Sequence, residues 1–158
     1  LIAGLAYLAD MDHPYRDEAL ATFHDRFKDN EQVMDKWLSI QAMASRPDTL
    51  DIVKGLKSHP IFSMRNPNKV RALISAFVAI NAVRFHTTDG SGYRFLADNV
   101  IELDPMNPQV AARLLGSLGN WRRFGKERQK LMKEQLERVL ATSGLSNDSH
   151  AIAIKSLK

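Results

Sequence analysis

Two stretches of the chain begin in the same way: residues 66–74 read NPNKVRALI and residues 107–115 read NPQVAARLL. Asparagine is a strong N-cap, and proline suits the first helical position because its missing N–H would have no partner there anyway. Each Asn-Pro pair therefore predicts the start of a helix. From residue 66 to residue 107 the offset is 41 residues, which lies within the ~40–47-residue period of helical-hairpin repeats of the HEAT and armadillo kind.

The remaining sequence also has a helical period, because apolar residues recur at spacings of three and four. Nine helices are predicted, near residues 1–10, 15–27, 30–45, 48–57, 67–82, 91–103, 107–119, 125–142 and 146–157. No segment alternates at period two, so no sheet is expected. The predicted fold is all-α, a superhelical stack of antiparallel helix pairs (a HEAT/armadillo-like α-solenoid) forming one domain over residues 1–158. A compact helix bundle remains the alternative.

Composition limits the possible functions. The chain has 158 residues, 22 Lys and Arg against 18 Asp and Glu, and no cysteine. Disulfides, thiolate metal sites and a cysteine nucleophile are excluded, and a reducing, cytoplasmic location is expected. No apolar run approaches the ~18–20 residues of a membrane span, so no membrane contact is expected. The start at Leu1, without an initiator Met or a basic segment, is typical of a fragment of a longer protein rather than of a signal peptide.

Residues 84–95, RFHTTDGSGYRF, contain two glycines around a serine just before a predicted helix. A glycine loop before a helix could hold a phosphate, but such loops usually follow a strand and bring a lysine. The structural interpretation is favoured: Gly90 allows the turn, and Asp89 or Ser91 caps the helix. The aromatic residues on either side are expected to pin the loop to the core: Phe85 and Tyr93.

The histidines offer no metal site. They stand at positions 13, 24, 59, 86 and 150, and none belongs to an H-E-x-x-H motif or to a pair four residues apart. Zinc on a helix needs that spacing to bring two imidazoles to one face. His13 and His59 are expected in exposed turns, His24 on the surface and His86 half-buried. No catalytic residue, metal ligand or cofactor is predicted in this chain.

Several segments together are similar to a known family. NPNKVRALISAF (66–77), FHTTDGSGYRFLAD (85–98) and NPQVAARL (107–114), with VMDKWLSIQA (33–42) before them, resemble the C-terminal domain of bacterial aminopeptidase N. The aminopeptidases N are zinc enzymes of the gluzincin group, and they remove N-terminal amino acids from peptides. The resemblance implies an excised helical domain that caps the catalytic domain and limits access to its active-site chamber. Its partners would be the catalytic domain of the same parent chain, where zinc is bound, and peptide substrates.

The resemblance also points to two site residues. Gln109 and Arg113 stand at i and i+4, opposite the apolar side of the predicted helix at 107–119. By resemblance, Gln109 bounds the pocket for the first substrate side chain, and Arg113 reaches toward the peptide beyond the scissile bond. From spacing alone, a solvated helix face is the alternative.

Two other functions stay open at this point. The chain could be an autonomous helical-repeat scaffold that binds a protein or peptide on its concave face. The segment at 121–130, WRRFGKERQK, could bind single-stranded nucleic acid through Trp121, Phe124 and the basic residues between them. The basic residues are otherwise scattered, so nucleic-acid binding is not expected.

Overall fold

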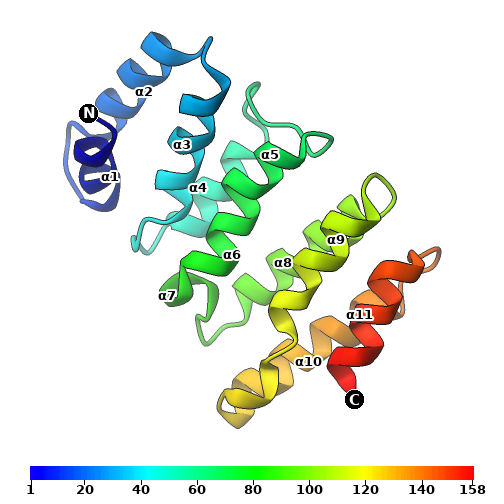
Figure 1. Cartoon of the computed structure of the whole chain (residues 1–158). Coiled ribbons are helices and arrows are strands. Elements are labelled where there is room, and N and C mark those ends of the chain that lie inside the picture. Colours follow the sequence, from blue (N-terminus) through cyan, green and yellow to red (C-terminus); the bar gives the residue numbers. More distant parts are fainter. The chain divides into compact units, whose positions relative to one another are not determined.

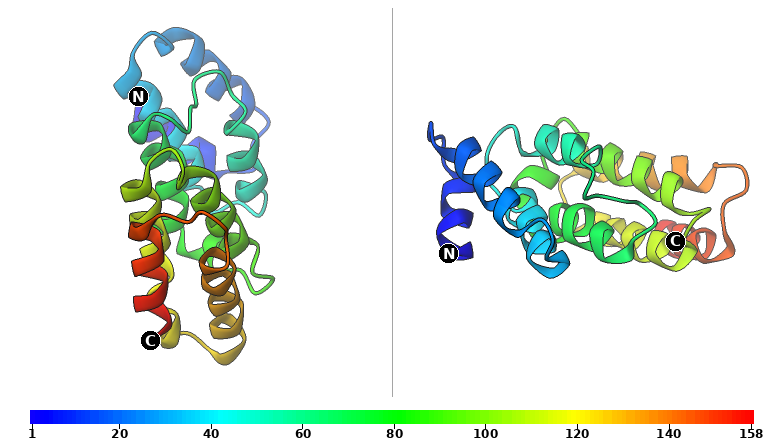
Figure 2. Two further views of the ribbon diagram at one scale, coloured as in Figure 1. Left: turned by 90° about the vertical axis from the view of Figure 1, so that its right-hand side faces the viewer. Right: turned by 90° about the horizontal axis from the view of Figure 1, so that it is seen from above.

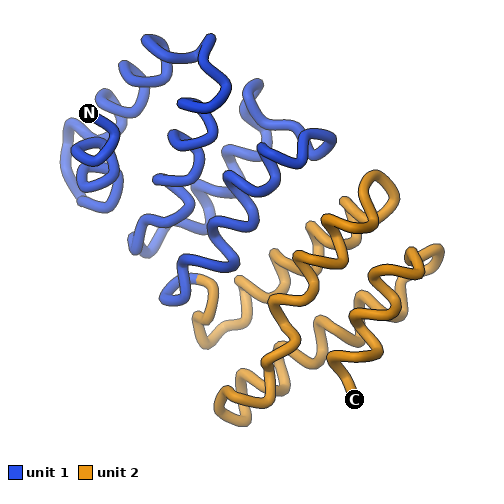
Figure 3. Tube along the Cα trace, in the orientation of Figure 1, with its two compact units in different colours: residues 1–84 blue, residues 85–158 orange.

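The computed structural model describes residues 1–158, and 71% of them are helical with no strand. The all-α prediction is therefore confirmed (Figure 1). The chain divides into two compact units, Leu1–Arg84 and Phe85–Lys158 (Figure 3). None of the helices combines the length and the apolar character needed to span a bilayer.

Unit 1 is organised around α3 (Glu31–Ala42). This helix packs against α1 (Ile2–Asp10), α2 (Arg16–Phe27) and α4 (Thr49–Leu56), and against the long helical segment that follows Asn66. The apolar stripes read from the sequence supply the core. Its fully buried members include Met34, Leu38, Val53, Val70, Leu73, Ile74 and Phe77.

The helix expected over 67–82 is more complex than its sequence pattern suggested. It begins as α5 (Pro67–Val70), continues as a π-helical turn (Arg71–Ser75) and ends as α6 (Ala76–Ile80). It stops at Asn81, whose backbone leaves the helical region and whose side-chain amide donates to the carbonyls of Ala42 (2.9 Å) and Ala44 (2.7 Å). A short helix, α7 (Ala82–Phe85), follows.

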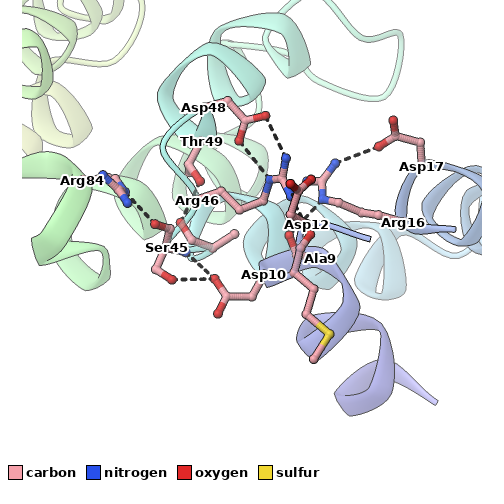
Figure 4. A network of polar contacts seen from close by, with 12 residues as sticks. Ala9, Asp10, Asp12, Arg16, Asp17, Ser45, Arg46, Asp48, Thr49 and Arg84 are labelled. Atoms are coloured by element: carbon pink, nitrogen blue, oxygen red, sulfur yellow. Dashed lines mark hydrogen bonds and ion pairs between the residues drawn. The ribbon is translucent and has the colours of Figure 1, made fainter. Parts of the chain in front are cut away.

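A polar network in unit 1 joins the turn after α1 to the turn after α3 (Figure 4). The Asp10 carboxylate accepts from the backbone N–H of Ser45 (2.5 Å) and from its hydroxyl (2.8 Å). These bonds, the backbone one first, hold the pKa of Asp10 below its usual value. Arg46 donates through Nε to Asp48 (2.9 Å), and Arg84 donates to the Ser45 carbonyl (2.6 Å). The network ties the end of α1 and Arg84 to the turn between α3 and α4.

Unit 2 consists of two antiparallel helix pairs. The first is α8 (Ser91–Leu103) with α9 (Pro108–Leu115), and the second is α10 (Lys126–Leu140) with α11 (Asn147–Leu157). Two 3₁₀ turns, Gly116–Leu118 and Trp121–Arg123, connect α9 to α10. Across the pairs, α9 packs against α11 and α8 against α10 (Figure 2). The fully buried core residues are Tyr93, Leu96, Val100, Leu115, Leu118, Met132, Leu136 and Val139.

Both Asn-Pro helix starts are confirmed. The Asn66 side chain accepts from the backbone N–H of Asn68 (3.0 Å), and the Asn107 side chain accepts from that of Val110 (3.2 Å). In each case proline occupies the first turn. The local chemistry of two residues thus places the starts of α5 and α9.

Candidate functional site

The candidate site is the exposed side of α9. Gln109 and Arg113 are both solvent-exposed and lie one turn apart in the first two turns of this helix. No hydrogen bond or ion pair within the chain holds either side chain. An unpaired guanidinium and an amide on one helix face are free to bind a partner's carbonyl, carboxylate or amide group.

The other side of α9 holds it in place. It packs against α8 and α11 through a set of buried apolar side chains. These are Ala111, Ala112, Leu114 and Leu115, with Leu118 in the following turn. The predicted separation of the two faces is therefore confirmed, with Val110 half-buried at the boundary. The role of Gln109 and Arg113 stays a prediction.

A buried carboxylate anchors the turn before α9. Asp104 is only 3% exposed. It accepts from the backbone N–H of Ser146 (2.7 Å), from the Ser146 hydroxyl (2.6 Å) and from the Ser149 hydroxyl (2.5 Å). Ser146 is itself the N-cap of α11, because its hydroxyl accepts from the Ser149 N–H (3.2 Å). Asp104 thus ties the α8–α9 turn to the start of α11.

The electrostatics of Asp104 follow from these bonds. Burial raises the pKa of its carboxyl, but the bonds from Ser146 and Ser149 outweigh burial, so the pKa lies below its usual value. Asp104 is therefore an ionised, fully bonded structural group. The sequence analysis missed it, because its partners lie more than 40 residues away; an Asp just after a helix and a Ser-x-x-Ser at the next helix start are weak signals on their own.

The glycine loop before α8 has the structural role predicted for it. Gly90 adopts φ 70°, the left-handed region that favours glycine. Asp89 accepts from the backbone N–H of Ser91 (3.0 Å), from the Ser91 hydroxyl (2.7 Å) and from Thr87 (2.8 Å). The N-cap position itself is occupied by Gly90, which forms no side-chain cap bond; of the two residues considered, Asp89 accepts from the first helical N–H and Ser91 is a donor. An anionic side chain already occupies the position that a phosphate would need.

Aromatic packing fixes this loop within unit 2. The Phe85 and Tyr93 rings meet edge to face at 5.3 Å and are almost fully buried, as expected. His86 Nδ1 shares a 2.8 Å hydrogen bond with the Tyr93 hydroxyl, and its ring stacks on Phe124 at 4.4 Å. Burial lowers the pKa of His86 and raises that of Tyr93. Both groups are therefore neutral near pH 7, which suits a packed hydrogen bond rather than proton transfer.

Replacement of Asp89 by alanine is expected to destabilise unit 2 by about 1 kcal/mol, the usual effect of losing a cap. The bond from the Ser91 N–H, then its hydroxyl, lowers the pKa of Asp89 from 3.8 to about 2. This stabilisation is therefore complete above pH 3.8 and is lost as the pH falls toward 2. Urea unfolding followed by circular dichroism at several pH values measures it. Thr88→Ala, at an exposed neighbour, is the control, and equal losses in both variants would contradict the capping role.

His24 and His59 do not lie where the sequence suggested. The His24 side chain is only 22% exposed. Its ring packs at 5.2 Å from Trp37 and at 5.0 Å from His59, which is also half-buried. The expectation of a surface His24 and an exposed His59 is therefore wrong, because Trp37 on α3 packs against His24 on α2 and against His59 in the turn after α4. The chain contains no group of three His, Cys, Asp or Glu side chains that could hold a metal.

The aromatic residues of the segment 121–130 are engaged inside unit 2. Trp121 Nε1 donates to the Ser156 carbonyl (2.8 Å), and Phe124 stacks on His86. Arg122 donates to the same Ser156 carbonyl (2.9 Å) and lies over the Trp121 ring. These rings are therefore not arranged as a free stacking platform for bases.

Comparison with known families matches the whole chain, residues 1–158, to a domain of unknown function with ARM repeats, DUF3458_C. Armadillo repeats are stacked helices, which agrees with the predicted α-solenoid class. The match extends over both compact units.

Similar bacterial chains include three that are each named aminopeptidase N. The chain is 42% identical to the Caulobacter vibrioides protein (99% of this chain, 18% of that protein) and 38% identical to the Escherichia coli protein (99% and 18%). It is 44% identical to the Haemophilus influenzae protein over 84% of this chain and 15% of that protein. The chain thus spans less than a fifth of the length of these relatives.

A solved structure has the same fold. The crystal structure of Legionella pneumophila aminopeptidase A in complex with aspartic acid matches 99% of this chain with a TM-score of 0.93 and 33% identity. The match covers 18% of the Legionella chain. Sequence and structure therefore identify the same limited portion of a much larger protein.

Proposed function

Since the chain belongs to the DUF3458_C family of ARM-repeat domains and is homologous to the C-terminal portion of aminopeptidase N, we propose that it caps the catalytic part of an aminopeptidase and limits access to its active-site chamber. The two compact units act together as one domain in this proposal. Homology to larger aminopeptidases supports this function over an independent repeat scaffold. The lack of cysteine supports a cytoplasmic enzyme.

The observation that carries the proposal is the match of the whole chain to a small part of these enzymes. A rigid helical wall over a catalytic site excludes folded proteins and admits short peptides. It also removes bulk water, which strengthens the electrostatic interactions that orient the substrate. In this proposal hydrolysis belongs to the catalytic part, where a bound zinc would polarise the peptide carbonyl.

Within this domain, the exposed side of α9 is the surface that we assign to substrate. Gln109, in the first turn, bounds the pocket of the first side chain, and Arg113 interacts with the peptide beyond the scissile bond. Support comes from their unpaired, exposed side chains and from the fixed position of α9. A guanidinium binds carbonyl and carboxylate oxygens in a defined geometry.

Kinetics of the parent enzyme, the full-length aminopeptidase that contains this domain, test this assignment. Arg113→Ala is expected to raise KM for tripeptides about 10-fold with little change in kcat, because one charge-assisted hydrogen bond to bound substrate is lost. An amino-acyl anilide, which lacks the distal peptide, should be less affected. Gln109→Ala should instead change the preference among first residues.

The matched control is Arg123→Ala, which removes an exposed arginine from the 3₁₀ turn outside α9. It should leave both substrates unchanged. Unaltered peptide kinetics in both α9 variants would reject the assignment of Gln109 and Arg113 to substrate. The purified 158-residue chain should hydrolyse neither substrate. Measurable hydrolysis would reject the proposal that catalysis belongs to the catalytic part of the enzyme.

A further inference from the structure

We propose that His24, His59 and Trp37 form an acid-sensitive latch, which holds the turn after α4 (residues 57–62) while His59 is neutral and releases it when His59 is protonated. This inference goes beyond the proposed function and does not depend on it. The three rings pack on one another. Their centroids lie 5.0 Å apart for the two histidines, 5.2 Å for His24 and Trp37, and 5.4 Å for His59 and Trp37. The cluster therefore joins the turn to α2 and α3.

The hydrogen bonding of His59 requires a neutral ring. Its Nδ1 accepts from the backbone N–H of Ile61 (3.2 Å), so the proton of the neutral imidazole lies on Nε2. A second proton on Nδ1 would remove the lone pair that accepts, and would set two N–H groups against each other. The His59 carbonyl also accepts from the N–H of the buried Phe62 (2.9 Å). Protonation of this one ring therefore disrupts a turn whose end lies in the core.

No carboxylate pairs with His59. On α2, Asp25 Oδ1 lies 3.3 Å from His24 Nδ1, so a proton on His24 can be shared with that carboxylate. The other charges of α2 that face the cluster, Arg16 and Asp17, pair with each other at 2.8 Å. The cluster borders a hollow of about 400 Å³, to which α3 and α4 contribute only uncharged side chains: Trp37, Gln41 and Ile52. A positive charge on His59 would therefore have no counter-ion.

The surroundings of His59 set the direction of the pH effect. Burial, and then the neighbouring His24, lower the pKa of His59 below 6.5. On the turn itself, Lys57 adds a further positive charge. Because the folded pKa lies below the unfolded one, the latch contributes its full stability above pH 6.5 and loses it as the pH falls through the folded pKa. Protonation of both histidines would place two cations side by side against Trp37, so acid favours release of the turn.

Amide hydrogen exchange at Ile61, followed by NMR on the 158-residue chain and corrected for the intrinsic effect of pH on exchange, tests the latch. We expect the protection factor to fall between pH 7 and pH 5 by at least about 3-fold. The upper limit is about 30-fold, which applies to a histidine of pKa 6.5 that is protonated only when the turn is open. A protection factor that stays constant over this range would overturn the proposal, and this measurement needs no variant.

His59→Asn identifies the group that titrates. An asparagine side chain can accept from the backbone N–H two residues further on, but it does not titrate between pH 5 and 7. In this variant the protection of Ile61 should therefore stay constant from pH 7 to pH 5. A fall as large as that in the unmutated chain would show that His59 is not the latch.

His24→Gln tests the contribution of the second histidine. Without the charge of His24 beside it, His59 should be protonated more readily, so the fall in Ile61 protection should move to higher pH. The backbone N–H of Tyr15 is the matched control, because it donates to His13 Nδ1 (3.2 Å) in an exposed turn. Its pH dependence should be the same with and without His24. An unchanged pH dependence at Ile61 would reject the coupling between the two histidines.

Discussion

Gly92→Ala is expected to destabilise unit 2 by more than about 3 kcal/mol. A Cβ at position 92 would lie 2.1 Å from the carbonyl oxygen of Phe85, and 2.8 and 2.9 Å from its carbonyl carbon and Cα. These are backbone atoms, so no side-chain rotation can relieve the overlap. Phe85 is itself 1% exposed and packs on Tyr93. Relief therefore requires α8 to move away from the preceding turn.

Two other glycines provide controls for Gly92→Ala. Gly90→Ala meets only the side chains of Leu131 and Arg94, at 3.2 Å or more, but places alanine at φ 70°, so a loss of about 1–2 kcal/mol is expected. Gly55→Ala meets no atom within 4 Å inside α4 and should stabilise by about 0.5–1 kcal/mol. Urea unfolding gives all three values. A loss for Gly92→Ala no larger than that for Gly90→Ala would contradict the close approach.

The contrast among these glycines shows what sequence reasoning could and could not supply. The turn at Gly90 and the caps at Asn66 and Asn107 depend on a few neighbouring residues, so their local chemistry predicted them. The tight contact of Gly92 with Phe85 depends on how two segments pack, and glycine was read there only as part of a loop. The Gly-Ser-Gly sequence is therefore explained by one positive φ and one backbone contact.

Helix interiors were predictable and helix interruptions were not. Apolar periodicity located the stripes in α3, α8 and α10 because a helix has a fixed repeat. It could not show the π turn at Arg71–Ser75, since one extra residue in a turn leaves the surrounding pattern nearly intact. The Trp37 cluster with His24 and His59 was missed for a different reason: packing brings together α2, α3 and the turn after α4, which are distant in sequence.

The sequence predicted where the candidate site lies, but not which distant residues hold it in place. Gln109 and Arg113 lie on the exposed face of α9 because their spacing is one helical turn, which sequence alone conveys. Their function depends on polypeptide outside this domain, and no periodicity within it could establish that. The turn that leads into α9 is anchored by Asp104, whose partners Ser146 and Ser149 are distant in sequence.

Asp104→Ala is expected to destabilise unit 2 by about 3–5 kcal/mol, because it leaves a buried hydroxyl, a part-buried hydroxyl and a part-buried N–H without their shared acceptor. Asp98→Ala, on the preceding helix α8, is the matched control. Asp98 is 64% exposed and pairs only with the surface side chain of Arg138, so a loss of at most about 1 kcal/mol is expected. Equal losses in the two variants, measured by urea unfolding, would show that Asp104 does not anchor α11.

Asp104→Asn keeps the volume of the side chain but removes its charge and one of the two oxygens that accept from Ser146 and Ser149. The folded pKa of Asp104 is below the usual 3.8, so the charge stabilises the fold fully above pH 3.8 and less as the pH falls through the folded pKa. The difference in free energy of unfolding between the unmutated chain and Asp104→Asn should therefore be constant from pH 5 to 7 and become smaller in acid. A difference that stays unchanged down to the acid limit of folding would mean that the loss comes from the missing acceptor oxygen and not from the charge. A shrinking difference would mean that the three donors need the charge of Asp104.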